Sequence, residues 1–274
     1  MHPKEILMSL EAGARKSLSQ NFLVSPHWAA TIVRIGLEEP ADEIWEIGPG
    51  LGALTQVILE KAKVPVRLFE YDKKFAEYLR KKFPSVQVAE GDFLEQGIIE
   101  IVGEIAGNKK VVVVSNLPYH ISSKIFFHLA TIRPSLVRMV LTFQKEFAER
   151  LVAVPRTKAY SSLSIMGQSL FKMDSLGTIP AKAFYPAPTV ASEAVLFTPS
   201  PFEEKFVKPL ERVLRVSFQF RRKKLINNLK RAFPPNDVDA AFSNMKLSEN
   251  CRPEELTKEK FMALTSLLMY KNPG

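Results

Sequence analysis

The sequence contains few of the residues that build disulfide frameworks and metal sites. Cys251 is the only cysteine in 274 residues, which excludes an internal disulfide and a cysteine-based zinc site. The four histidines are scattered along the chain, so we expect no bound metal. So little cysteine suits a reducing compartment, and we expect a cytoplasmic location.

Long apolar runs are absent as well. No stretch is long enough to cross a bilayer, and charged residues interrupt the N-terminal region, which leaves no room for the apolar part of a signal peptide. Hydrophobic residues make up 46% of the chain and charged residues 24%, a balance that is typical of globular proteins. We therefore expect no membrane partner.

Acidic residues are missing from one segment of the chain. Between Arg212 and Arg231 eight residues are Lys or Arg and none is Asp or Glu, in a chain whose formal net charge is +9. Such clustering indicates a polyanionic partner, most often nucleic acid. The alternative interpretation is a solvated helix face. The candidate contacts with RNA phosphates are Arg221, Arg222, Lys223 and Lys224.

Strand and helix patterns alternate through the first 150 residues. Strands are expected at 43–47, 64–70, 86–89, 110–115 and 137–143, and each is followed by a helical pattern. This order predicts an α/β fold of the Rossmann-like, doubly wound type with a mostly parallel sheet. Two later strands flank a proline-rich loop, and the last of them is expected to be antiparallel.

The composition changes at Thr198-Pro199-Ser200-Pro201, which is the best candidate for a linker. Beyond this point the pattern is helical and basic, with helices expected at 204–220, 222–232, 238–242 and 258–270. We therefore expect a larger domain over residues 1–198 and a small, basic helical domain that binds RNA over residues 199–274.

Asn116-Leu117-Pro118-Tyr119 is the most informative motif in the chain. It follows the run Val111–Val114, whose four β-branched residues predict a strand that is buried on both faces. Open α/β sheets bind ligands at the carboxyl ends of such strands. An amide, backbone carbonyls and an aromatic ring at that edge could hold the amino group and the ring of a nucleobase. The alternative is an ordinary proline turn.

The second candidate element is the glycine-rich turn Gly48–Gly52, which follows the first predicted strand. Glycines let a backbone turn sharply and approach a ligand closely. Glu70 closes the next strand, where a carboxylate can accept hydrogen bonds from ribose hydroxyls. Asp92 follows the third strand and could meet an adenine amino group. The alternatives are a surface carboxylate paired with nearby lysines for Glu70 and a helix N-cap for Asp92.

The spacing of these glycines departs from the dinucleotide fingerprint, because Gly52 falls one position early and position 53 is Ala. No basic residue stands near the turn to meet a diphosphate, whereas Glu46 places a negative charge beside it. The turn therefore favours a cationic sulfonium cofactor. A nicotinamide oxidoreductase stays open as an alternative.

Several motifs occur in a fixed order along nearly the whole chain, and together they resemble those of the KsgA (RsmA) family of small-subunit ribosomal RNA adenine dimethyltransferases. Each motif is weak by itself, whereas the set is specific. In chain order the motifs are Arg15-Lys16-x-x-x-Gln20-Asn21-Phe22-Leu23, Glu46–Gly52, Gly91-Asp92, Asn116–Ser122, Phe184–Ser192, Phe220–Leu229 and Arg252–Leu256.

The resemblance implies a class I methyltransferase domain over residues 1–198, with S-adenosylmethionine as methyl donor. The implied substrate is a pair of adjacent adenosines in the 3′-terminal hairpin loop of 16S rRNA, within the small ribosomal subunit or its precursor. Each adenosine would be methylated twice at N6, by a monomeric enzyme. The family's cofactor contacts fall on Asn21, Leu23, Gly48, Glu70, Asp92 and Asn116.

The family's catalytic corner falls on Asn116, Leu117, Pro118 and Tyr119, with Phe184 expected to stack on the opposite face of the target base. The alternative for Phe184 is packing in the core. The chain departs from the family pattern at four positions: Ser19, His120, Thr189 and Ala191. The last two weaken the case for charged RNA contacts from the proline-rich loop.

Two other functions stay open within this reading. Relatives of the same fold methylate adenine in the large ribosomal subunit, and others act as ribosome-assembly or nucleic-acid-binding factors. Leu117 and the Arg15-Lys16 arm favour the small-subunit branch. The intact Asn-Leu-Pro-Tyr motif favours an enzyme over a binding factor.

Overall fold

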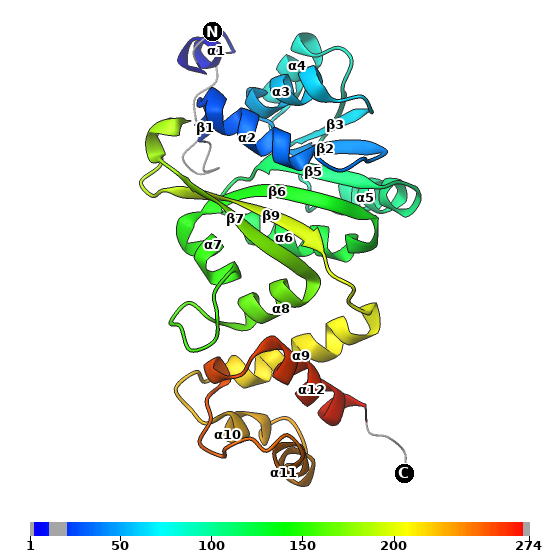
Figure 1. Cartoon of the computed structure of the whole chain (residues 1–274). Helices are drawn as coiled ribbons and strands as arrows, with labels where there is room; N and C mark the ends of the chain where they lie inside the picture. The colour runs from blue at the N-terminus through cyan, green and yellow to red at the C-terminus, as the bar shows by residue number, and fades with distance from the viewer. Residues whose placement is uncertain (1–2, 11–20, 271–274) are drawn as a thin grey trace. The chain divides into compact units, whose positions relative to one another are not determined.

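The computed structural model describes residues 3–10 and 21–270 of the chain (Figure 1). Residues 1–148 and 173–199 form one compact unit, and residues 149–172 and 200–274 form a second. Arg15, Lys16, Ser19 and Gln20 of the N-terminal motif lie outside the described residues. Within the described ranges, no helix is both long and apolar enough to span a membrane.

A seven-stranded sheet forms the centre of the first unit, in the order β4-β3-β2-β5-β6-β9-β7. Neighbouring strands from β4 to β6 are parallel, and β9 runs antiparallel to β6. The prediction of a mostly parallel, doubly wound sheet is confirmed. The strands are β2 (Glu43–Ile47), β3 (Val66–Glu70), β4 (Gln87–Glu90), β5 (Val111–Asn116), β6 (Leu136–Gln144), β7 (Phe171–Ile179) and β9 (Ser192–Pro199).

Helices cover both faces of this sheet, with α2 and α3 on one face and α6 on the other (Figure 1). Helix α2 begins at a Ser-Pro sequence: Pro26 occupies its first turn, and the backbone N–H of Trp28 donates to Ser25 Oγ at 3.4 Å. The helices of the unit are α1 (Pro3–Ser9), α2 (Pro26–Gly36), α3 (Ala53–Lys61), α4 (Lys73–Lys82), α5 (Gln96–Asn108), α6 (Ser122–Thr131) and α7 (Lys145–Leu151).

Strand β5 is buried on both faces, as its four valines predict. Val112 and Val114 pack in one hydrophobic cluster with Ile32 and Val33 of α2. Because β5 lies between β2 and β6, its carboxyl end opens beside the glycine-rich turn that follows β2. The strand therefore brings Asn116 to the centre of the sheet edge.

A separate two-stranded ladder joins two distant parts of the sequence. Strand β1 (Phe22–Leu23) pairs antiparallel with β8 (Phe184–Tyr185), so that Phe22 lies opposite Tyr185 and Leu23 opposite Phe184. The ladder connects the N-terminal arm to the proline-rich loop. It was not predicted, because two-residue strands carry no periodicity.

The second unit is a cluster of helices. Leu210 and Val213 of α9, Phe261 and Leu264 of α12, and Leu229 of α10 are buried in it. Thr257 caps α12 by accepting the backbone N–H of Lys260. The helices are α8 (Ser162–Leu170), α9 (Val207–Phe218), α10 (Leu225–Leu229), α11 (Pro235–Asn244) and α12 (Lys258–Met269).

The compact units differ from the expected domains in residues 149–172, which fold with the C-terminal segment. Three side-chain hydrogen bonds explain the difference. Tyr160 Oη donates to the Leu256 carbonyl at 3.0 Å, and Lys258 Nζ donates to the Gln168 carbonyl at 3.2 Å. Arg221 donates to the Tyr160 carbonyl at 2.8 Å. No local sequence pattern in residues 149–172 predicts these long-range hydrogen bonds.

The expected helix over residues 222–232 begins three residues later, at Leu225. The basic run from Arg221 to Lys224 therefore lies in the turn between α9 and α10. The prediction placed these basic residues on a helix, where consecutive side chains point in different directions and cannot all face one surface. In the turn, all four residues are exposed.

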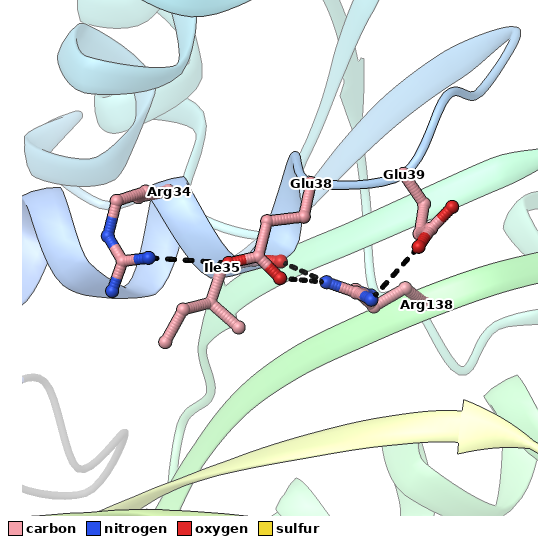
Figure 2. Close-up of polar contacts among 5 residues, drawn as sticks. All are labelled: Arg34, Ile35, Glu38, Glu39 and Arg138. Atoms are coloured by element: carbon pink, nitrogen blue, oxygen red, sulfur yellow. Dashed lines mark hydrogen bonds and ion pairs between the residues drawn. The ribbon is translucent and has the colours of Figure 1, made fainter.

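Figure 2 shows how one arginine ties the end of α2 to the sheet. Arg138 lies on β6, and its guanidinium donates to the Ile35 carbonyl at 2.8 Å and to Glu38 at 2.7 Å. Glu39 accepts a longer bond of 3.4 Å. Because the Arg138 side chain is only 12% exposed, these contacts hold a charge that is largely shielded from water.

Replacement of this arginine provides a test of the contact between α2 and the sheet. We expect Arg138→Met to lower the free energy of unfolding by about 2 kcal/mol, because the Ile35 carbonyl and two carboxylates each lose one hydrogen-bond donor. The midpoint of urea unfolding measures the change. Arg34→Met is the matched control, since Arg34 pairs with Glu38 from a side chain that is 62% exposed; we expect a loss below ~0.5 kcal/mol. Equal losses of unfolding free energy in the two variants would contradict a stabilising role for the Arg138 contacts.

Candidate active site

A cavity of about 250 Å³ opens at the carboxyl ends of β2, β3, β4 and β5. It lies entirely within the first unit. This is the edge at which doubly wound sheets bind ligands. Nine of the residues singled out in the sequence line it together: Asn21, Leu23, Gly48, Glu70, Asp92, Asn116, Leu117, Pro118 and Tyr119.

Two close approaches by glycine bring the motifs into contact. At Gly48 the backbone φ is +65°, and a Cβ atom there would lie 3.3 Å from Pro118 Cδ. At Gly50 the φ is +55°, and a Cβ atom would lie 2.9 Å from Phe22 Cε1. Both positions disfavour any other residue, through backbone strain and through the lack of space. The glycine-rich turn thus packs against the Asn-Leu-Pro-Tyr corner and the N-terminal arm.

Glu70 is buried at the end of β3, where only 5% of it is exposed. Its two carboxylate oxygens accept backbone N–H groups from Gly50 at 3.0 Å and Asp72 at 2.8 Å. Burial raises the pKa of Glu70 to about 7, against the lowering effect of these two bonds. The alternative of a surface carboxylate is wrong. Held this way, the carboxylate keeps further lone pairs that can face the cavity.

Glu46 is a second buried carboxylate on the cavity wall, with 2% exposed. Thr55 Oγ1 donates to its Oε2 at 2.6 Å. Burial raises the pKa of Glu46 to about 8, and the nearby charge of Glu70 adds to the effect. The negative charge that the sequence suggested beside the turn is therefore mostly neutralised at pH 7. A cation in the cavity would favour its ionised form.

Asp92 lies in the turn after β4, half-buried on the cavity wall. Its Oδ1 accepts the backbone N–H of Leu94 at 2.9 Å, which orients the side chain. This bond shapes a turn and is not a cap of α5, which begins at Gln96. The neighbouring Phe93 also lines the cavity, and its ring packs edge-on against Phe69 at 5.1 Å.

Asn116 has both ends of its side-chain amide engaged. Its Nδ2 donates to the Asn21 carbonyl at 3.1 Å, and its Oδ1 accepts from Thr142 Oγ1 at 2.5 Å. Thr142 lies opposite Asn116 in the β5–β6 ladder and is fully buried. No sequence pattern singled out Thr142, because a threonine inside an apolar strand is ordinary.

Tyr119 is held in a similar way, by a hydrogen bond of 2.5 Å between its hydroxyl and Ser192 Oγ. Burial raises the pKa of Tyr119 above its ordinary value, so the hydroxyl stays protonated at neutral pH. The ring lines the cavity and is available for stacking. Ser192, the first residue of β9, is fully buried.

The backbone carbonyls of the corner differ in their engagement. The Pro118 carbonyl accepts the N–H of Ile121 at 3.2 Å, and the Tyr119 carbonyl accepts from Ser122 N and Oγ. These bonds form the turn that leads into α6. Because the Pro118 and Tyr119 carbonyls are already engaged, these bonds favour the Leu117 carbonyl as the acceptor for a ligand.

Phe184 does not line the cavity among the described residues. It is 3% exposed and packs in the same hydrophobic cluster as Ile32 and Val33 of α2. Its pairing with Leu23 in the β1–β8 ladder accounts for this placement. Stacking of a base on Phe184 does not fit this packing, which agrees with the alternative of a core residue.

Several cavity residues were not singled out from the sequence. Phe22 belongs to the N-terminal motif, and Tyr71 follows Glu70 with 57% of its surface exposed. An aromatic residue directly after the carboxylate is the one signal that could have indicated Tyr71. Ile121 and Ile125 follow the corner into α6, and their helical spacing places both on the cavity side.

The four basic residues that the sequence suggested as RNA contacts divide into two kinds. The Arg221 guanidinium donates to the Lys158 carbonyl at 3.0 Å and to the Tyr160 carbonyl at 2.8 Å. Arg221 therefore shapes its own unit, and its expected role as a phosphate contact is weakened. Arg222, Lys223 and Lys224 are exposed in the turn.

The charges around the cavity restrict its ligand. Three carboxylates line it, whereas its described lining includes neither Lys nor Arg. A diphosphate would lack counter-charges there, and a cation would find them. No group of His, Cys, Asp and Glu within residues 3–10 and 21–270 could hold a metal ion. A Rossmann-like sheet whose cavity is lined by carboxylates, with neither Lys nor Arg in its described lining, indicates the class of S-adenosylmethionine-dependent methyltransferases.

Comparison with known proteins identifies the family. Residues 12–269 match the family model for ribosomal RNA adenine dimethylase, and the chain belongs to that family. It is 33% identical to the ribosomal RNA small subunit methyltransferase A of Chlorobium chlorochromatii, over 96% of each chain. It is 36% identical to the protein of that name from Porphyromonas gingivalis, over 93% of this chain and 97% of the relative.

Solved structures agree with this assignment. A dimethyladenosine transferase from Plasmodium falciparum is 26% identical and superposes with a TM-score of 0.74, over 89% of this chain and 95% of that one. The 23S rRNA methyltransferase ErmE is 24% identical, with a TM-score of 0.67 over 90% of this chain and 99% of that one, and shows the fold alone. The chain is an S-adenosylmethionine-dependent methyltransferase, as the resemblance of its motifs implies.

Proposed function

We propose that this protein transfers methyl groups from S-adenosylmethionine to N6 of two adjacent adenosines in the 3′-terminal hairpin loop of 16S rRNA. The observation that carries the proposal is one shared cavity, in which a carboxylate-lined pocket meets the Asn116–Tyr119 corner. The small-subunit names of the relatives support this target. A large-subunit target rests on likeness of fold alone.

The proposed cofactor contacts follow from the geometry of the wall. The Glu70 carboxylate, held by two backbone N–H groups, would accept the ribose hydroxyls. Asp92 would accept from the adenine amino group, and Gly48 leaves room for the amino-acid part. Asn21 and Leu23 would close the cavity from the N-terminal arm. Bound S-adenosylmethionine supplies an electrophilic methyl carbon on a positively charged sulfur.

The corner would then activate the acceptor nitrogen. The lone pair of adenine N6 is delocalised into the ring, which makes the amine a poor nucleophile. Hydrogen bonds from N6–H to Asn116 Oδ1 and to the Leu117 carbonyl favour a pyramidal nitrogen with its lone pair restored. The same acceptors stabilise the positive charge that develops on nitrogen. Positioning of this kind can supply roughly 7–11 kcal/mol of the acceleration.

Tyr119 would hold the plane of the base. An adenosine must leave its stack to reach the cavity, at a cost of a few kcal/mol, which is lowest in an unpaired loop. Stacking on an aromatic ring offsets roughly 1–3 kcal/mol of that cost. The Tyr119 ring is suited to this role, because its hydroxyl is fixed by Ser192.

The second unit would bind the RNA backbone. Arg222, Lys223 and Lys224 are the candidate phosphate contacts, exposed in one turn. In domain terms, residues 1–198 carry the methyl transfer and residues 199–274 the RNA binding, with residues 149–172 packed into the latter. We further propose a monomeric, cytoplasmic protein with no membrane partner.

The role of the corner is tested by Asn116→Ala. We expect the rate of methyl transfer to fall at least about 100-fold, because the acceptor for N6–H is lost, while rRNA binding changes less than about twofold. Mass spectrometry of rRNA, after incubation of undermethylated small subunits with isotope-labelled donor, measures the product. Asn244→Ala, an exposed change in the second unit, is the control. Equal turnover by Asn116→Ala and the parent would reject the assignment.

The same measurement separates the rival functions. A parent protein that binds small subunits without methylating them would be a binding factor. Label that enters isolated large subunits would assign the protein to the large-subunit branch.

The ribose contact predicts a pH dependence of binding. Because burial raises the pKa of Glu70 to about 7, its accepting, ionised form is lost as the pH falls through 7. We expect 5′-methylthioadenosine, which has no group that titrates between pH 6 and 8, to bind about tenfold more weakly at pH 6 than at pH 8. Calorimetry in a Glu46→Gln background removes the second titration. Glu70→Gln should show weak, pH-independent binding; a flat profile in the parent would contradict the role of Glu70.

The phosphate contacts predict a salt dependence. We expect Arg222→Ala to weaken binding of an rRNA hairpin and to lower the slope of log affinity against log salt by about 0.7–0.9, as for one lost phosphate contact. Fluorescence anisotropy over a salt series measures the slope. Lys81→Ala removes an equally exposed charge from the first unit and should leave the slope unchanged. A slope that is the same for Arg222→Ala and the parent would exclude Arg222 from the RNA interface.

A further inference from the structure

Both side chains of the corner that can touch a base are tethered to hydroxyls from outside the motif. Asn116 Oδ1 accepts from Thr142 Oγ1, and the Tyr119 hydroxyl bonds to Ser192 Oγ, each at 2.5 Å. Thr142 and Ser192 are both fully buried. Each of these buried hydroxyls forms its hydrogen bond with a side chain of the corner, so we expect it to affect how that side chain is held.

The two hydroxyls stand on one face of one ladder. In the antiparallel β6–β9 pair, Gln144 lies opposite Ser192 and Thr142 lies opposite Ala194. Residues that lie opposite each other, and residues two apart on one strand, share a face of the sheet. Thr142 and Ser192 therefore belong to the same face, and Asn116 shares it because it lies opposite Thr142 in the β5–β6 pair.

The bonds to Asn21 and Thr142 together orient the Asn116 amide and leave its oxygen end able to serve a ligand. The Asn21 carbonyl can only accept, so the NH₂ end of Asn116 must face it. The oxygen end then receives the Thr142 proton and keeps a second lone pair for another donor. A half-turn of the amide would present N–H groups to an exocyclic amine, and the two donors would repel each other.

We propose that Thr142 and Ser192 are positioning residues for methyl transfer. Thr142 fixes the Asn116 amide with its oxygen available to the amino group of the target base, and Ser192 fixes the plane of the Tyr119 ring. Neither residue lines the cavity, so both act through the corner. This inference rests on the proposed function, because it assigns Thr142 and Ser192 to the corner that the proposal uses.

The experiment compares Thr142→Val with Thr142→Ser. Valine keeps the shape and the strand preference of threonine without the hydroxyl, whereas serine restores the hydroxyl. We expect Thr142→Val to lower kcat roughly 10- to 100-fold and Thr142→Ser to recover to within about threefold of the parent. The dissociation constant of S-adenosylmethionine should change less than about twofold in both. Thr265→Val is the matched control, since Thr265 is fully buried in the second unit and donates to the Phe261 carbonyl.

The Ser192 tether is tested by a double-mutant cycle with Tyr119→Phe. We expect Ser192→Ala and Tyr119→Phe each to lower kcat/KM about threefold, and the double variant to lose no more than either single one, because each removes the same bond. Losses that multiply in the double variant would overturn the role of Ser192.

Three results would overturn the role of Thr142, and they are distinguishable from failure of the proposed function. An unchanged kcat in Thr142→Val would do so. A loss in Thr142→Val that Thr142→Ser does not restore would also do so. So would a fall in kcat that comes with a comparable loss of S-adenosylmethionine affinity and a lower melting temperature, because that pattern marks a merely structural residue. Failure of the proposed function appears separately, as full activity in Asn116→Ala.

Discussion

The site depends on the contact between the glycine-rich turn after β2 and the Asn116–Tyr119 corner after β5. These strands are neighbours in the sheet, and a Cβ atom at Gly48 would lie only 3.3 Å from Pro118. Hence the glycine-rich turn and the Asn116–Tyr119 corner line one cavity. Reaction by direct transfer requires such proximity, because the two reacting atoms must approach without a carrier between them.

Burial of two carboxylates at this cavity has an energetic cost in the free protein. The pKa values of Glu46 and Glu70, about 8 and about 7, lie above that of an unfolded glutamate. At these two groups the folded chain binds more protons than the unfolded chain between pH 4.5 and 8, and their contribution to stability falls as the pH rises through this window. A cationic cofactor favours the ionised carboxylates, so its binding offsets this loss most strongly at higher pH.

The sequence predicts what local patterns determine. Strand β2 was placed at its observed bounds, because an apolar strand pattern is a short-range signal. Glu70 was predicted to lie at the site because it closes the strand that follows the glycine-rich turn in the sequence. Phe184 was not placed, because its burial depends on pairing with Leu23, which is 161 positions away. The contacts of Thr142 with Asn116 and of Arg221 with backbone carbonyls were not predicted for the same reason. They form only when distant segments of the chain pack together.

Folding of residues 149–172 with the C-terminal segment makes the second unit discontinuous in sequence. The chain leaves the first unit after Ala148, returns at Met173, and leaves again after Pro199. A cut at the apparent linker would consequently not release a self-sufficient module, since α8 would remain behind with its apolar side stripped of α9 and α12. Transfer of the second unit to another protein thus requires grafting two separate stretches of chain at once.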